Sequence, residues 1–212
     1  MGETSNDFHP NPAGGGRLIT GAILAGGKSL RFGKNKALQQ IGGKRLIERA
    51  IESLRPFCDP IVVVANEIEP YLDTSVSLAV DIVAHQGPLG GIYTALLYSP
   101  AEWILVKATD MPFLVPEMVS LLIDSRKGFD VVVPKLNDYY EPLLAMYNQR
   151  CLRAIARQLE QPDKRQVFGF YRKVRIRALA DGEWRKVDPG ALSFKNVNTP
   201  SDLAELDGLE RS

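Results

Sequence analysis

Residues 21–38 read GAILAGGKSLRFGKNKAL, and this stretch decides how the rest of the chain is interpreted. An apolar run ends at Leu24, and a glycine-rich turn follows at Ala25, Gly26 and Gly27. Glycine allows a backbone to approach a ligand closely and to turn its N–H groups toward it. The stretch therefore predicts a phosphate-binding loop directly after the first strand of an α/β domain.

Four basic residues follow the turn at short spacing: Lys28, Arg31, Lys34 and Lys36. They are compatible with two different kinds of phosphate-binding loop. The end of the P-loop pattern G-x-x-x-x-G-K-[ST] is matched by Gly27, Lys28 and Ser29. Its first glycine position holds Ala22, which lies inside the apolar run, so a P-loop here would be too short to wrap a phosphate. A P-loop NTPase thus fits the sequence incompletely.

Length and composition predict one cytoplasmic domain. A chain of 212 residues suits a single core, and a formal net charge of +1 gives no reason to expect a nucleic-acid or membrane partner. The apolar runs are shorter than the roughly 18 to 20 residues of a membrane helix, and the N-terminus lacks the pattern of a secretory signal. Two cysteines, Cys58 and Cys151, are too few for a disulfide scaffold and favour a reducing compartment.

Residues 1–16 contain Asn, Pro and Gly without an apolar period, which predicts a disordered leader, so residues 17–212 form the single domain. Apolar runs predict strands at 17–24, 61–65, 77–80, 103–108, 130–133, 143–147 and 174–179, with Pro134 ending the fifth of them. Helical periods or caps predict helices at 44–54, 116–125 and 150–159, one with Pro88 at its first turn that runs through Ile92 to Leu97, and one entered from 196–206. This alternation predicts a three-layer α/β/α domain with a mostly parallel central sheet.

Polar features follow four of the predicted strands. They are the glycine turn, Asn66, Asp81 and Asp110. Ligands of open parallel sheets bind beyond the carboxyl ends of the strands. We therefore expect these four features to converge on one edge of the sheet.

Four segments in this order resemble the motifs of a known family: LAGGKSLRFGKNKAL (24–38), QGPLGGI (86–92), ATDMP (108–112) and NVNTPSDL (196–203). The first is similar to the signature loop of nucleotidyltransferases with a Rossmann-like fold. Together they resemble the MobA family of molybdenum cofactor guanylyltransferases, over nearly the whole chain after Arg17.

The resemblance implies a Mg²⁺-dependent enzyme that transfers GMP from GTP to molybdopterin, or to its molybdenum-loaded form, and releases pyrophosphate. It also allows contacts with a molybdoenzyme or another protein of the cofactor pathway. The implied nucleotide-binding residues are Leu24, Ala25, Gly26, Gly27, Lys36, Asn66, Asp81 and Asp110. The implied catalytic residues are Arg31, Lys36 and Asp110, with Asp110 as the metal ligand, and Asn196 and Asn198 lie toward the second substrate.

This chemistry suits the residues, because nucleotidyl transfer needs positioning and charge stabilisation rather than a Ser, Cys or His nucleophile. His9, His85 and both cysteines lie outside the four motifs. Mg²⁺ usually takes one or two carboxylates together with phosphate oxygens and water, which suits Asp110 after a strand.

The chain departs from the family pattern at three places, of which the smallest is Phe32, where Arg31-Phe32-Gly33 replaces the commoner Arg-Met-Gly. Asn35 stands where an aspartate often precedes the lysine, and Tyr139-Tyr140-Glu141-Pro142 replaces a frequent His-Pro-Glu-Pro. Gly26 favours guanine over cytosine, since the related cytidylyltransferases usually carry LAAG.

Two further functions fit part of the pattern. One is a sugar-phosphate nucleotidyltransferase, and the second is a non-catalytic nucleotide-binding module, although Lys36 and Asp110 speak against the latter. A basic run over 172–177 predicts a solvated face, or else a rim for the pterin phosphate or a partner protein.

Overall fold

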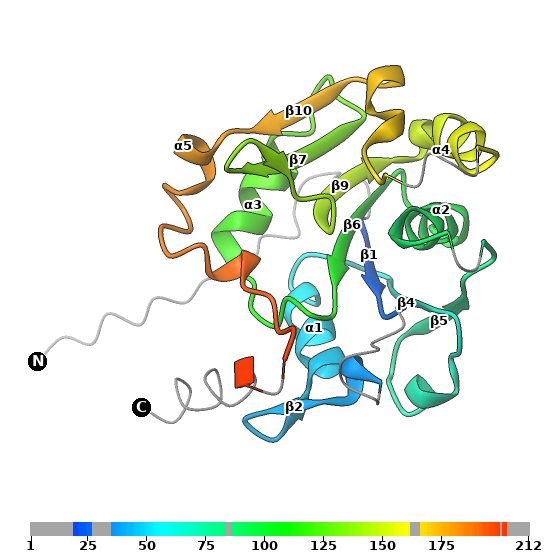
Figure 1. Ribbon diagram of the computed structural model, residues 1–212, viewed down its shortest axis with the longest axis vertical. Coiled ribbons are helices and arrows are strands. Elements are labelled where there is room, and N and C mark those ends of the chain that lie inside the picture. The colour runs from blue at the N-terminus through cyan, green and yellow to red at the C-terminus, as the bar shows by residue number, and fades with distance from the viewer. Residues whose placement is uncertain (1–18, 27–34, 84–85, 162–165, 200, 203–212) are drawn as a thin grey trace, which may run out of the picture.

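The strand that precedes the glycine turn, β1 (Ile19–Leu24), is buried along its whole length. It pairs in parallel with β4 (Ile61–Ala65) on one side and with β6 (Trp103–Ala108) on the other. The computed structural model of the chain describes residues 19–26, 35–83, 86–161, 166–199 and 201–202 (Figure 1). The predicted leader at 1–16 lies outside this range.

The described residues form a main sheet of eight strands in the order β10-β7-β9-β6-β1-β4-β5, with β8 paired to β7. Along this order β9 is antiparallel to β6 and to β7, and the other neighbours are parallel. The remaining strands of the sheet are β5 (Ser77–Val80), β7 (Val131–Leu136), β8 (Tyr139–Tyr140), β9 (Leu144–Asn148) and β10 (Ile176–Leu179). A separate hairpin joins β2 (Gln40–Ile41) to β3 (Lys44–Arg45).

Helices cover both faces of the sheet (Figure 1). One face packs against α1 (Leu46–Leu54) and α3 (Pro116–Asp124), and the other against α2 (Pro88–Tyr98) and α4 (Leu152–Leu159). The shorter helices are α5 (Asp181–Trp184) and the 3₁₀ helices η1 (Lys36–Leu38), η2 (Glu69–Tyr71), η3 (Gln149–Cys151), η4 (Gly169–Lys173) and η5 (Leu192–Phe194). The predicted three-layer α/β/α architecture with a mostly parallel sheet is confirmed. No helix in the described ranges is long and apolar enough to cross a membrane.

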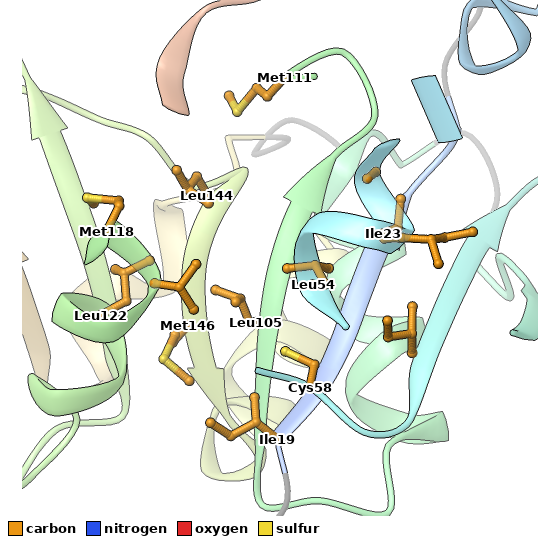
Figure 2. Close-up of a cluster of buried hydrophobic side chains, with 14 of the residues drawn as sticks. Ile19, Ile23, Leu54, Cys58, Leu105, Met111, Met118, Leu122, Leu144 and Met146 are labelled. Carbon is orange, nitrogen blue, oxygen red and sulfur yellow. The ribbon is translucent and has the colours of Figure 1, made fainter. Parts of the chain in front are cut away.

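The core is divided by the sheet into two apolar layers. Figure 2 shows the layer on the α1 and α3 side, where Leu54 of α1 and Leu122 of α3 face strand residues such as Leu105. Each such burial contributes roughly 1.5–3 kcal/mol. Successive side chains of a strand point to opposite faces, so Ile104 and Val106 of β6 belong to the layer beneath α2 and α4.

The boundary predicted at Pro134 is wrong, because β7 continues to Leu136. Lys135 and Leu136 pair with the two residues of β8, and the Pro134 carbonyl accepts a hydrogen bond from the Glu141 N–H at 2.9 Å. A proline interrupts a strand ladder only where the ladder needs the N–H group that proline lacks. Toward the β7–β8 hairpin Pro134 takes part through its carbonyl, so the missing N–H does not end the strand.

A lysine lies in the apolar core, and it belongs to the strand that leads to Asp110. Lys107 of β6 is fully buried, and its Nζ donates a hydrogen bond to the Met111 carbonyl in the following loop. Burial lowers the pKa of the Lys107 ammonium to about 7, although the nearby Asp110 carboxylate acts in the opposite direction. Lysine is rarely buried without a partner, so this bond fixes the loop after β6 to the core.

We predict that Lys107→Met changes how the stability of the protein depends on pH. The ordinary lysine pKa in the unfolded chain is 10.5, whereas in the folded chain it is about 7. Between these values the unfolded state binds more protons, so the free energy of unfolding of the wild-type chain rises with pH relative to the variant. Denaturant titrations of both proteins at a series of pH values from about 7 to about 10 measure this difference. A difference that stays constant over this range would contradict the prediction.

Candidate active site

The four strand-end features predicted from sequence lie along one edge of the sheet. Because β1, β4, β5 and β6 are parallel, the residues that follow them emerge at the same carboxyl edge. Leu24 at the end of β1 is level with Val64 of β4 and with Ala108 of β6. The strand ends that lead into these four features are therefore neighbours: the glycine turn, Asn66, Asp81 and Asp110.

Three side chains from three separate motifs meet at this edge. The Lys36 Nζ lies 3.1 Å from Asp110 Oδ2 and 3.1 Å from Asn198 Oδ1. The side chains of Lys36 and Asp110 remain 17% and 31% exposed, so both can reach a ligand from solvent. All three residues were predicted from sequence, and the structure brings them together.

Each of these three residues is held by its own segment. Lys36 begins η1, which Asn35 caps by accepting a hydrogen bond from the Ala37 N–H at 3.1 Å. The Asp110 carbonyl accepts a hydrogen bond from the Val197 N–H at 2.8 Å. Val197 itself packs with Ile41 and Leu46 in a small apolar cluster, and this contact anchors the segment that carries Asn198.

Tyr71 connects the two described ends of the glycine loop, and it was not predicted from sequence. The Asn35 Nδ2 donates to the Tyr71 Oη at 2.9 Å, and the Tyr71 hydroxyl donates to the Ala25 carbonyl at 3.2 Å. Burial raises the pKa of the Tyr71 phenol, so it keeps its proton for this bond. An ionised aspartate at position 35 would have no N–H to offer the phenol, which gives the asparagine found here a structural role. No motif surrounds Tyr71, so pattern alone could not find it.

Asp81, the residue after β5, is hydrogen-bonded to α2. Its Oδ1 accepts hydrogen bonds from the Thr94 hydroxyl at 2.8 Å and from the Val83 N–H at 3.0 Å. A Cβ atom at Gly90 would lie 2.8 Å from the Val83 carbonyl oxygen and 3.2 Å from Asp81 Oδ2, so only glycine permits this close packing. Part of the QGPLGG motif therefore has a structural cause, and the nucleotide contact assigned to Asp81 stays a prediction.

The remaining assigned residues fall into two groups. Asn66 and Asn196 are both exposed. Asn66 also lies beside the glycine turn, since a Cβ atom on Gly26 would lie 3.8 Å from the Asn66 Nδ2. Gly27, Lys28, Arg31 and Lys34 lie outside the described residues.

The structure also bears on the P-loop pattern and on the basic run. Ala22, which would open a P-loop, pairs with Val62 and Val106 inside β1, so the loop required by that motif does not form around it. In the basic run, the Arg175 side chain donates two hydrogen bonds to Asp130, at 2.9 and 2.7 Å, and Arg177 pairs with Glu183. These two arginines serve to attach β10 to its neighbours.

We predict that Tyr71→Phe destabilises the protein, because it leaves the Ala25 carbonyl and the Asn35 amide without their partner. Loss of one partner from a buried hydrogen bond costs about 1–3 kcal/mol. Tyr98→Phe is the matched control, since Tyr98 is 59% exposed and such surface changes stay within about 0.5 kcal/mol. Urea unfolding of the three proteins measures the difference. Equal stability of the two variants would show that the link through Tyr71 contributes nothing.

Comparisons with known proteins agree with this geometry. The family model of the MobA-like NTP transferase domain matches residues 21–176. The molybdenum cofactor guanylyltransferase of Desulfosudis oleivorans is 37% identical over 191 residues, which cover 89% of this chain and 94% of that protein. The crystal structure of molybdopterin-guanine dinucleotide biosynthesis protein A from Archaeoglobus fulgidus has a TM-score of 0.78 and 30% identity, covering 91% of this chain and 98% of that one. The chain therefore belongs to the MobA-like NTP transferase family.

Proposed function

We propose that this chain transfers GMP from GTP to molybdopterin, or to its molybdenum-loaded form, and releases pyrophosphate. The observation that carries the proposal is the meeting of Lys36, Asp110 and Asn198 at the carboxyl edge of the sheet. The choice of GTP as donor and of molybdopterin as acceptor is supported by the names of two relatives. One is a molybdenum cofactor guanylyltransferase, and the other is a molybdopterin-guanine dinucleotide biosynthesis protein. Membership of an NTP transferase family supplies the reaction class.

The proposed reaction is an in-line displacement at the α-phosphorus of GTP. A phosphate oxygen of the acceptor forms the new P–O bond as the bond from the α-phosphorus to the bridging oxygen breaks. Pyrophosphate leaves with the electron pair of that bond. The attacking phosphate is already ionised, so the enzyme has to position two anions and stabilise charge rather than supply a general base.

The glycine turn and the basic residues would bind the phosphates of GTP. The Ala25 N–H already donates to the Val64 carbonyl at 2.9 Å, so the turn that begins with Gly26 would present the N–H groups. Lys36 would contact phosphate oxygens through charge-assisted hydrogen bonds, together with Arg31. Asn66 and Asp81 would lie on the nucleoside side, and Asn196 and Asn198 toward the acceptor.

The described residues fit a magnesium ion. Asp110 and Asn198 offer a carboxylate and an amide oxygen, which are hard donors of the kind Mg²⁺ prefers. One cationic group, the Lys36 ammonium, already lies 3.1 Å from both oxygens, so the space between them accepts positive charge. Mg²⁺ bound by these residues would polarise the phosphate oxygens and neutralise charge in the transition state.

We also propose a cytoplasmic location, because Cys58 and Cys151 are both free and buried. A reducing compartment keeps such thiols unpaired. A molybdoenzyme or another protein of the cofactor pathway would receive the product.

One prediction from the proposed function concerns the metal ligand. Asp110→Asn keeps a partly exposed side chain of the same size, so we expect it to fold normally and to lower Mg²⁺-dependent pyrophosphate release by at least about 100-fold. Asp138→Asn, a 97% exposed aspartate, is the control. Pyrophosphate release from GTP and molybdopterin gives the rate, and circular dichroism reports the fold. Normal turnover of Asp110→Asn would remove the metal assignment.

Another prediction from the proposed function concerns the nucleobase of the donor nucleotide. With Mg²⁺ and molybdopterin present, GTP should support pyrophosphate release and bind more tightly than CTP or ATP. A panel of the three nucleotides, scored by pyrophosphate release and by binding titration, tests the donor. Equal or better performance of CTP would favour a cytidylyltransferase over the function proposed here.

A further inference from the structure

Glu141 lies just before β9, at the edge of the sheet where β6 ends and the segment of Asp110 begins. The antiparallel register pairs Val106 with Ala145 and Lys107 with Leu144. The Ala108 N–H continues the ladder by donating to the Leu143 carbonyl at 3.0 Å. Asp110 follows Ala108 by two residues and Glu141 precedes Leu143 by two residues, so both segments leave the pairing of β6 with β9 at the same edge of the sheet.

The charges of these two residues act on each other. Burial raises the pKa of the half-buried Glu141 carboxyl, and the negative charge of Asp110 raises it further. Two negative charges that lie close enough to interact repel each other. The Lys36 ammonium offsets charge on Asp110, and a divalent cation near both carboxylates would remove the remaining repulsion.

Glu141 is held firmly in its place. Its N–H donates to the Pro134 carbonyl at 2.9 Å, and its Oε1 accepts a hydrogen bond from the Leu143 N–H at 3.1 Å. Within the described part of the chain, Oε2 accepts no hydrogen bond. One carboxylate oxygen thus fixes the orientation of the group, and the other remains for a ligand.

We propose that Glu141 is a second carboxylate ligand of the divalent cation held by Asp110. The inference rests on the proposed nucleotidyl transfer and its Mg²⁺ requirement. Mg²⁺ in phosphate-binding sites takes one or two carboxylates, and Asp110 and Glu141 supply two at this edge of the sheet. Asp110 belongs to the loop after β6 and Glu141 to the β8–β9 turn, so the two ligands would come from separate segments.

The test measures metal binding directly, with Mn²⁺ in place of Mg²⁺ and free Mn²⁺ counted by electron paramagnetic resonance. Glu141→Gln keeps the hydrogen bond from the Leu143 N–H, because its amide oxygen can accept it. Glu102→Gln is the matched control, since Glu102 is 24% exposed and pairs with Gln149 at the other end of the same two strands. We expect Glu141→Gln to raise the dissociation constant for Mn²⁺ at least about tenfold, and Glu102→Gln to leave it unchanged.

Thermal unfolding distinguishes a metal ligand from a purely structural role of Glu141, because the two roles predict different changes in Tm. Mg²⁺ should raise the Tm of the wild-type chain, because it binds the folded state. Without Mg²⁺, Glu141→Gln should melt no lower than the wild type, since the repulsion from Asp110 is gone, and added Mg²⁺ should raise its Tm less.

Two results would overturn the inference. One is wild-type Mn²⁺ affinity in Glu141→Gln together with a lowered Tm, which would make Glu141 structural. The other is wild-type Mn²⁺ affinity with a raised KM for molybdopterin, which would assign Glu141 to the acceptor. A wild-type chain that binds Mn²⁺ through Glu141 but transfers no GMP would instead reject the proposed function and keep the metal ligand.

Discussion

The parallel pairing of β1 with β6 is the constraint on which the site depends. Both strands are buried along their whole length, so their register is set by side chains packed on two faces. A shift by one residue would turn every side chain to the opposite face, and would exchange Lys107 with an apolar neighbour. With Leu24 fixed opposite Ala108, the Thr109 N–H reaches the Leu24 carbonyl at 3.4 Å. The glycine turn and the loop of Asp110 are therefore adjacent before any ligand arrives.

The site is completed by segments that belong to no strand of the main sheet. Lys36 comes from η1, and Asn198 follows a residue bonded to the Asp110 carbonyl. The two are separated by 162 residues in sequence, yet Lys36 donates a hydrogen bond to Asn198. Such a centre forms only when the whole chain has folded, so local opening of either segment would disable it without unfolding the sheet.

The sequence was sufficient to name three residues that the fold brings together in the candidate site. Lys36, Asp110 and Asn198 could be named because each occupies a fixed place in a spaced pattern, and the β-branched run at 61–65 predicted β4 to the residue. Tyr71 acts through contacts with segments distant in sequence, which no local pattern records. Lys107 was included in an apolar run, although a lysine within WILVKA could have served as a signal. Strands of two residues, such as β8, have too few positions to show a period.

The reversed direction of β9 has a consequence for the cost of binding. A parallel strand reaches the ligand edge with the residues that follow it, which enter a loop. A reversed strand reaches it with the residues that precede it, and here these lie in a tight turn bonded to β7 and to β9 itself. A turn whose backbone is hydrogen-bonded to two strands has little conformational entropy left to lose when a ligand arrives. This corner of the molecule is therefore preorganised, and more of its interaction energy remains as affinity.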